Sequence, residues 1–310
     1  MSLSRHRFLL VGDWGNSSTR TFARVVHDIG HLPFLHARDA PVDILSAGDN
    51  LYPVGAHSWL DPMWHAHYQQ AWANVPADRL LSVLGNHDKM RGTPVGLFSS
   101  PENASSISSV ASPPWVMPNA YWVQHFPDIR TDIWFLDTCE LDWQQSIRLG
   151  VPTPSDIVNR AAVQLAWLRD TLSQSRAAFK MCVGHYPVVS RGPHGGSAQL
   201  QQHLLPLFRE FKVDLYISGH DHNLQWGRDP EGSTHFLISG AASYHVPPAY
   251  KSPHRNDLLH PDWITWTGQG GGYWDVEVVG TFDTVVLVAT CHHATDEEHG
   301  FEENRFFLLR

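Results

Sequence analysis

The feature that most constrains the fold of this sequence is a repeated unit, in which an apolar, strand-like run is followed by a polar tip and a helix-like stretch. The run at 7–13 precedes a pattern that begins near Thr19, with apolar residues at helical spacing. The runs at 42–50 and 79–88 repeat the unit, and a tryptophan-rich helical stretch at about 58–73 lies between them. Short apolar runs that alternate with helices are typical of βαβ units. The sequence therefore predicts an α/β fold.

The second half of the chain is predicted to be more antiparallel. The segments "NAYWVQHF" and "TDIWFLDT" predict an antiparallel pair of strands. Helices are expected at 159–174 and 198–211, before and after a strand at 178–187. The tail segments "GYWDVEVVG", "DTVVLVATC" and "RFFLLR" predict an antiparallel meander. Since neither an internal repeat nor a domain boundary is visible, residues 1–310 are expected to form one domain.

Composition excludes several classes of function. The formal net charge of −9 argues against a nucleic-acid-binding surface, which carries a basic stripe, and no apolar run is long enough to cross a membrane. Cys139, Cys182 and Cys291 are too few and too scattered for a disulfide framework or a cysteine-based zinc site. We expect a monomer. No signal peptide is visible, so the cytoplasm is favoured over secretion or the lysosome, although the compartment is left open.

Five strand-like runs end in a tip of the same kind, with a glycine directly before polar side chains. The tips are Gly12-Asp13, Gly48-Asp49-Asn50 with Tyr52, Gly85-Asn86-His87-Asp88, Gly184-His185 and Gly219-His220-Asp221-His222. Glycine allows a sharp turn and a close approach of the backbone. In open α/β sheets, ligands bind beyond the carboxyl ends of the strands. One such tip is also typical of an ordinary turn, but five together predict a shared site.

The side chains of these tips indicate metal ions. Carboxylate, amide, phenol and imidazole groups without a thiolate form an oxygen and nitrogen ligand set. One carboxylate can bridge two ions, which lie about 3.5–4 Å apart in two-metal hydrolytic sites. Tyr52, three residues after Asp49, can reach the same ion, although a packed tyrosine is the alternative. A phenolate ligand favours a hard trivalent ion, so iron(III) is expected at one position.

The tips also carry a family resemblance. The blocks "GDWG", "GDNLY", "GNHD", "GHYP" and "GHDH", in this order, resemble those of the metallophosphoesterases. Within them, the chain is most similar to the purple acid phosphatases of the small tartrate-resistant (type 5) kind. Many other metallophosphoesterases begin with Asp-x-His, whereas the first block here is Asp13-Trp14-Gly15 and Tyr52 fills the missing role. The resemblance covers nearly the whole chain and implies an α-β-β-α sandwich of two mixed β-sheets flanked by helices.

The resemblance implies a binuclear site. The expected ligands of iron(III) are Asp13, Asp49, Tyr52 and His222. The expected ligands of the second ion, which is iron(II), zinc(II) or manganese(II), are Asp49 as the bridge, Asn86, His185 and His220. His87 and His194 match histidines that bind the phosphate and handle protons in the family, and a solvated loop histidine is the alternative for His194. We expect Asp88 to fix the orientation of His87.

The implied function is an acid phosphatase, which hydrolyses phosphate monoesters by a metal-bound hydroxide. Small phosphomonoesters, and also phosphoproteins or nucleotides, are the expected substrates. A phosphodiesterase or nucleotide pyrophosphatase with the same metal centre remains an alternative, as does an iron-binding or redox protein without turnover. The presence of His87 and His194 speaks against the last alternative, since metal storage needs neither. Residues 241–270 form either a gate over the site or a plain surface loop, and the side chains of interest there are Tyr244, Tyr250, Trp263, Trp266, Lys251, His254 and Arg255.

Overall fold

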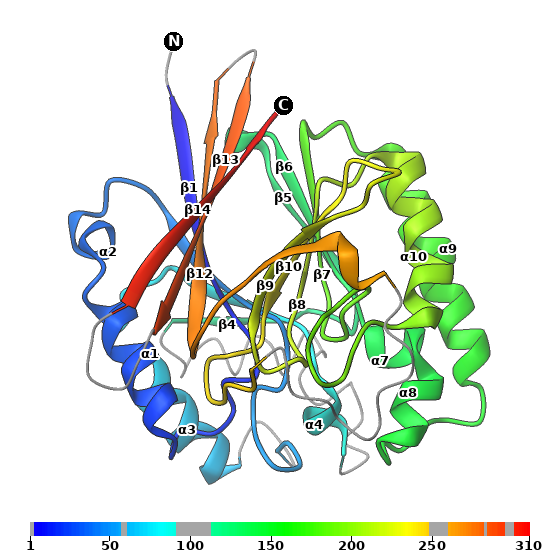
Figure 1. Cartoon of the computed structure of the whole chain (residues 1–310), viewed down its shortest axis with the longest axis horizontal. Coiled ribbons are helices and arrows are strands. Elements are labelled where there is room, and N and C mark those ends of the chain that lie inside the picture. The colour runs from blue at the N-terminus through cyan, green and yellow to red at the C-terminus, as the bar shows by residue number, and fades with distance from the viewer. Residues whose placement is uncertain (1–2, 57–60, 91–112, 248–259, 282–283, 295–300) are drawn as a thin grey trace.

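The computed structural model describes residues 3–56, 61–90, 113–247, 260–281, 284–294 and 301–310. These residues form two β-sheets that pack face to face, with helices on both outer sides (Figure 1). The predicted α-β-β-α sandwich of two mixed sheets is confirmed.

The first sheet has the strand order β14-β13-β12-β1-β2-β3-β4. Its strands are β1 (Ser4–Val11), β2 (Val42–Ser46), β3 (Arg79–Ser82), β4 (Trp115–Val116), β12 (Gly272–Gly280), β13 (Val285–Ala294) and β14 (Phe301–Leu309). Strands β1 to β4 run parallel, as the βαβ pattern predicts. Strands β12, β13 and β14 form the predicted antiparallel meander, and β12 pairs with β1 in antiparallel fashion.

The second sheet has the order β11-β9-β10-β8-β7-β6-β5. Its strands are β5 (Trp122–Phe126), β6 (Thr131–Phe135), β7 (Phe179–Val183), β8 (Leu215–Ser218), β9 (Leu224–Arg228), β10 (His235–Ser239) and β11 (Ile264–Thr267). The predicted antiparallel pair is β5 and β6, while β6, β7, β8 and β10 are parallel. Strands β4, β9 and β11 were not predicted from the sequence: β4 has only two residues, β9 contains Gly227, and β11 lies in a stretch without a clear pattern.

Helices cover both outer faces of the sandwich (Figure 1). On the side of the first sheet they are α1 (Arg20–Gly30), α2 (Pro33–Ala37) and α3 (Pro62–Trp72). On the side of the second sheet they are α7 (Thr138–Leu141), α8 (Trp143–Arg148), α9 (Ile157–Gln174) and α10 (Ala198–Phe211). The short helix α4 (Asn86–Lys89) follows β3, and two 3-10 turns are η1 (Pro127–Ile129) and η2 (Pro261–Trp263). Thr19 starts α1 because its side chain accepts a hydrogen bond from the N–H of Phe22.

The side chains of β1 point alternately to the two faces of the first sheet, and this explains how the layers hold together. Phe8 and Leu10 lie in the apolar cluster between the two sheets, whereas Leu9 and Val11 lie in the cluster beneath α1 and α3. Successive side chains of a strand point to opposite faces. Because both faces of this sheet are covered here, the strand is a continuous apolar run in the sequence. The carboxyl ends of the parallel strands in both sheets lie at the same end of the sandwich, near α4 (Figure 1).

The described residues also include the three cysteines and the helices named above. Cys139, Cys182 and Cys291 are buried and form no disulfide, as expected. Of the helices in the described ranges, none is long and apolar enough to cross a membrane.

Candidate metal centre

The polar tips of five strands, from both sheets, meet at one place. Asp13 follows β1, Asp49 follows β2, and Asn86 begins α4 after β3. His185 follows β7, and both His220 and His222 follow β8. The hydrogen bonds described below join the tips of the first sheet to those of the second. The structure therefore brings together all seven side chains that the sequence predicts as metal ligands, and metal binding by them stays a prediction.

Three of these side chains sit on backbone in the left-handed conformation. The φ angles are 56° at Asp13, 52° at Asp49 and 67° at His220. This conformation costs a residue other than glycine roughly 1–2 kcal/mol. It is held by bonds between the tips: the N–H of Asp13 donates to Gly48 O at 3.0 Å, and the N–H of His220 donates to Asp13 Oδ2 at 2.7 Å. Backbone strain of this kind clusters at functional sites.

The glycines of the tips provide space as well as turns. A Cβ atom at Gly85 would lie 2.1 Å from Asp49 Oδ1, and one at Gly219 would lie 2.6 Å from Asp13 Oδ2. Any side chain at these two positions would displace a carboxylate. At Gly85 and Gly219 the φ angle is an ordinary one. Glycine is required there because a carboxylate lies too close to leave room for a Cβ atom.

The first group of donor atoms surrounds the hydroxyl of Tyr52. Its Oη lies 3.0 Å from Asp13 Oδ1, 2.9 Å from Asp49 Oδ2 and 3.3 Å from His222 Nε2. Burial, together with the charges of Asp13 and Asp49, raises the pKa of Tyr52 well above its ordinary value. Tyr52 therefore keeps its phenol proton unless a strongly charged cation binds the oxygen and takes the place of the proton. This set of oxygen and nitrogen donors fits a hard cation such as iron(III).

The second group surrounds Nε2 of His185. The other ring nitrogen, Nδ1, lies 2.8 Å from Ala47 O, so a neutral ring carries its proton there and offers a lone pair at Nε2. That Nε2 nevertheless lies 3.0 Å from Asn86 Oδ1 and 3.4 Å from Asp49 Oδ1, which are both acceptors. These acceptors can face one another only with a positive group between them, which is a proton on Nε2 of His185 or a cation that takes the place of that proton. Although burial opposes the charge, Asp49 raises the pKa of His185 to about 9.

Asp49 connects the two groups. Its Oδ2 faces Tyr52 and its Oδ1 faces His185, so one carboxylate serves both positions. Asp13, Asp49 and His185 are buried, and each offers a ligand atom within 4.8 Å of the others. Burial opposes ionisation of Asp49, but the neighbouring His185 holds the pKa of Asp49 below its ordinary value. A carboxylate ionised in this way is suited to bridge two cations.

His220 belongs to the same cluster but has a partner that the sequence did not reveal. Its ring centroid lies 5.1 Å from that of His185, and its Nε2 lies 3.0 Å from Nε2 of Gln145 in α8. Burial and the neighbouring His194 lower the pKa of His220 well below its ordinary value, so the ring is neutral, as a metal ligand must be. Gln145 lies in a short helix without a motif, and no signal in the sequence marks it.

His87 is positioned differently from what the sequence predicts. Its ring centroid lies 4.4 Å from that of Tyr52, and its Nδ1 lies 2.6 Å from Pro53 O. The carbonyl of Pro53 thus takes the orienting role that we expected of Asp88.

The carboxylate of Asp88 instead accepts hydrogen bonds from backbone N–H groups. The donors are Asn50 at 2.9 Å, Leu51 at 3.1 Å and Gly85 at 2.8 Å. The physical reason is that Asp88, in the first turn of α4, reaches back to the N–H of the capping residue Gly85, while the tip after β2 brings the N–H groups of Asn50 and Leu51 to the same carboxylate. Burial and the charge of Asp49 raise the pKa of Asp88 to about 6.

Two further side chains lie at the rim. His194 is exposed, its N–H donates to Asp221 Oδ1 at 2.7 Å, and its ring centroid lies 4.4 Å from that of His220. Tyr244 stacks on His222 at 5.2 Å, and its hydroxyl accepts a hydrogen bond from Nδ2 of Asn16. Tyr244 is therefore the residue of 241–247 that adjoins the site through a ring contact.

The rest of the predicted gate is not at the site or is not described. Trp263 packs against Phe236 with a centroid distance of 6.1 Å, and Trp266 packs against Trp274 at 5.6 Å. Residues 248–259 lie outside the described part of the chain. A gate formed by the segment stays a prediction.

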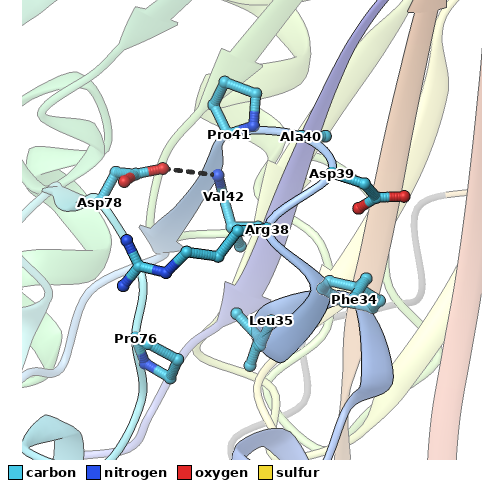
Figure 2. Close-up of a pocket in the computed structure, with 9 residues that line it drawn as sticks. All are labelled: Phe34, Leu35, Arg38, Asp39, Ala40, Pro41, Val42, Pro76 and Asp78. Atoms are coloured by element: carbon cyan, nitrogen blue, oxygen red, sulfur yellow. Dashed lines mark hydrogen bonds between the residues drawn. The ribbon is translucent and has the colours of Figure 1, made fainter.

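A surface cleft of about 340 Å³ lies elsewhere on the first sheet (Figure 2). It is lined by residues before β2 and β3, and the N–H of Val42 donates to Asp78 Oδ2 at 2.8 Å beside it. These residues precede the parallel strands, whereas the candidate metal centre follows their carboxyl ends. The cleft therefore contributes no side chain to the centre.

Comparisons with known proteins agree with this geometry. Residues 6–224 match the family model of the calcineurin-like phosphoesterases. The chain is 31% identical to purple acid phosphatase 17 of Arabidopsis thaliana over 249 residues, which are 76% of this chain and 68% of that protein. It is also 31% identical to tartrate-resistant acid phosphatase type 5 of Sus scrofa over 254 residues, which are 78% of this chain and 71% of that protein.

Two solved structures share the fold. GAP50, the anchor in the inner membrane complex of Plasmodium, aligns with a TM-score of 0.70 at 21% identity, over 97% of this chain and 88% of that chain. Purple acid phosphatase PPD1 from yellow lupin (Lupinus luteus) seeds aligns with a TM-score of 0.55 at 13% identity, over 97% of this chain and 53% of that chain. At these identities the likeness concerns the fold alone.

Proposed function

Because the chain belongs to the calcineurin-like phosphoesterase family and, within it, to the purple acid phosphatases, we propose that it is an acid phosphatase that hydrolyses phosphate monoesters. Members of this family hydrolyse phosphate esters with the help of metal ions. What we propose for this chain is the preference for monoesters and the acidic pH optimum. The observation that supports it most directly is the position of Tyr52 Oη, within 3.3 Å of Asp13 Oδ1, Asp49 Oδ2 and His222 Nε2.

The donor set fits two metal ions. The residues that would hold iron(III) are Asp13, Asp49, Tyr52 and His222. Those that would hold iron(II), zinc(II) or manganese(II) are Asp49, Asn86, His185 and His220. When bound, the two cations supply positive charge that neutralises the phosphate oxygens and activates water for attack at phosphorus.

The remaining side chains handle the phosphate and the proton. Hydrolysis forms a bond from water oxygen to phosphorus and breaks the ester bond, so the leaving oxygen needs a proton. His87 donates to Pro53 O through Nδ1, and in its doubly protonated form the ring would give the proton on Nε2 to the leaving oxygen and become neutral. His194, beside His220 at the rim, would bind a phosphate oxygen.

A substrate panel at varied pH tests this function. The rate should be highest with a monoester such as p-nitrophenyl phosphate, compared with a diester and a pyrophosphate, and its optimum should be mildly acidic. A preference for the diester or pyrophosphate would favour a phosphodiesterase or nucleotide pyrophosphatase instead. Bound iron without turnover on any substrate would favour an iron-binding or redox protein.

The proposal extends to partners. Small phosphorylated molecules are the proposed substrates, among them phosphomonoesters, nucleotides and phosphoproteins. The net charge of −9 supports a protein that binds no nucleic acid. We also propose that the protein is a monomer and has no membrane partner. Sedimentation of the metal-loaded protein tests whether it is a monomer.

A further inference from the structure

A buried segment behind the candidate metal centre, residues 137–145, is attached to the helices of the second sheet. We refer to it as the brace. The N–H of Asp137 donates to Gln164 Oε1 at 2.9 Å, and Gln164 Nε2 donates back to Asp137 O at 3.1 Å, which fixes one end of the brace to α9. Ser197, the first residue before α10, donates from Oγ to Asp142 Oδ2 at 2.6 Å. The brace is therefore anchored to both long helices.

The brace holds the turn that carries His185. Thr138 is fully buried, and its Oγ1 accepts hydrogen bonds from the N–H groups of His185 and Tyr186, both at 2.9 Å. These two N–H groups lie in the turn after β7, beyond the ladder of the sheet, and would otherwise need other partners. Thr138 thus fixes the backbone from which the His185 ring projects.

The brace also holds the ring of His220. The buried carboxamide of Gln145 lies 3.0 Å from His220 Nε2. In the orientation described, the Gln145 NH₂ group donates to this nitrogen, and rotation of the carboxamide would present Oε1 to an Nε2–H instead. In either tautomer, the side chain of Gln145 keeps the His220 ring in one orientation.

The third connection runs to Asn86 in the other sheet. Lys89, three residues after Asn86 in α4, forms an ion pair with Asp137 in which the two side chains are only 9% and 2% exposed. Burial opposes the charge on Lys89, but Asp137 raises its pKa, so the pair stays ionised. Helix α4 follows β3 of the first sheet, and the brace follows β6 of the second sheet. The ion pair between Lys89 and Asp137 therefore sets the distance between the parts of the site that the two sheets carry.

The three connections reach His185, His220 and Asn86, which with Asp49 are the expected ligands of the second metal ion. None of the hydrogen bonds found among the described residues joins the brace to Asp13, Tyr52 or His222, which belong to the first ion. We propose that Lys89, Thr138 and Gln145 are positioning residues that act through the brace on the second metal position and leave the first unaffected. The proposal deepens the proposed function, since it rests on the same binuclear centre.

The test measures metal binding directly. The variants Gln145→Leu, Thr138→Val and Lys89→Met are loaded with iron, and manganese(II) or zinc(II) is then titrated with its bound amount determined by elemental analysis. Loss of a residue that orients a ligand weakens metal binding about 10- to 100-fold. Each variant should therefore need about 10- to 100-fold more of the divalent metal for half occupancy. One equivalent of iron and its visible absorption band should be retained.

Two control variants separate this effect from general damage. Gln144→Leu changes the exposed neighbour of Gln145 in the same helix. Arg209→Met breaks the ion pair of Arg209 with the buried Asp229, near the amino end of β10. Both should bind the divalent metal as the unmodified chain does.

Unchanged affinity for the divalent metal in Gln145→Leu and Thr138→Val, or an equal loss of both ions, would overturn the proposal. These two variants decide the outcome if Lys89→Met does not fold. The measurement requires no turnover, so a chain that binds two metals but hydrolyses no monoester would disprove the proposed function alone.

Discussion

The hydroxyl of Tyr52 lies 2.9 Å from Oδ2 of Asp49, while the other oxygen of the same carboxylate faces His185. This relationship places the phenol on one side of the shared carboxylate and the imidazole on the other. It distinguishes the two metal positions chemically, because only the first includes a phenol. Removal of single groups should therefore affect the two positions differently.

Tyr52→Phe should abolish the visible colour of the iron-loaded protein. The band of a purple or pink iron protein requires the phenol oxygen, whereas the phenylalanine ring keeps the contact with His87 at 4.4 Å. The absorption spectrum and the iron content of the variant measure this. As a control, Tyr244→Phe removes a different hydroxyl near His222 and should keep the band. A coloured Tyr52→Phe protein would contradict the assignment of Tyr52 as the ligand.

His87→Ala should lower kcat by about 100- to 10,000-fold, which is the usual contribution of a positioned general acid. Both metal ions should remain bound, because the His87 ring contacts Pro53 O and Tyr52 and is not in either donor group. Steady-state kinetics and elemental analysis are the two measurements. The exposed His125, which pairs with Asp132, provides the control His125→Ala with unchanged kcat. Loss of both metals in His87→Ala would make His87 a ligand rather than a proton donor.

Asp88→Ala should lower the stability of the fold rather than disturb the orientation of His87. The substitution leaves the buried N–H groups of Asn50, Leu51 and Gly85 without their acceptor. An unsatisfied buried donor costs about 1–3 kcal/mol, so a total loss of at least about 2 kcal/mol is expected. Urea denaturation measures this free energy of unfolding. The exposed Asp128 offers the control Asp128→Ala, and equal stability of the two variants would refute the anchoring role.

His67 should make the protein less stable as the pH falls from about 6.5 to about 4. Its buried ring stacks on Trp14 at a centroid distance of 5.0 Å, and burial lowers the pKa of His67 to about 4. Between these pH values the unfolded chain binds a proton at His67 and the folded chain does not. Protons therefore favour unfolding, by up to roughly 3 kcal/mol at the acid end.

The variant His67→Phe should remove this part of the pH dependence while it keeps the stacking on Trp14. The free energy of unfolding, measured from pH 7.5 to pH 4, should fall less steeply in His67→Phe than in the unmodified chain. His36→Phe, at an exposed histidine of α2, serves as the control with an unchanged slope. Parallel curves for the unmodified chain and His67→Phe would show that His67 is not neutral in the fold.

Much of the fold could be predicted because its elements have strong local patterns. The helix expected at 198–211 is α10 (Ala198–Phe211), and the helix expected at 159–174 is α9 (Ile157–Gln174). Strands β9 and β11 and the brace escaped prediction. Their local sequence carries no clear pattern, and partners distant in the sequence stabilise them, such as Gln164 for Asp137.

The sequence by itself determined which donor groups this protein has and that each follows a strand. Glycine before a polar residue, at the end of an apolar run, is a local signal that needs no knowledge of distant contacts. Only the tertiary structure decided how the donors share partners: that Pro53, not Asp88, faces His87, and that Gln145 faces His220. The physical reason is that these distances depend on the packing of two sheets whose contacting residues lie far apart in the chain.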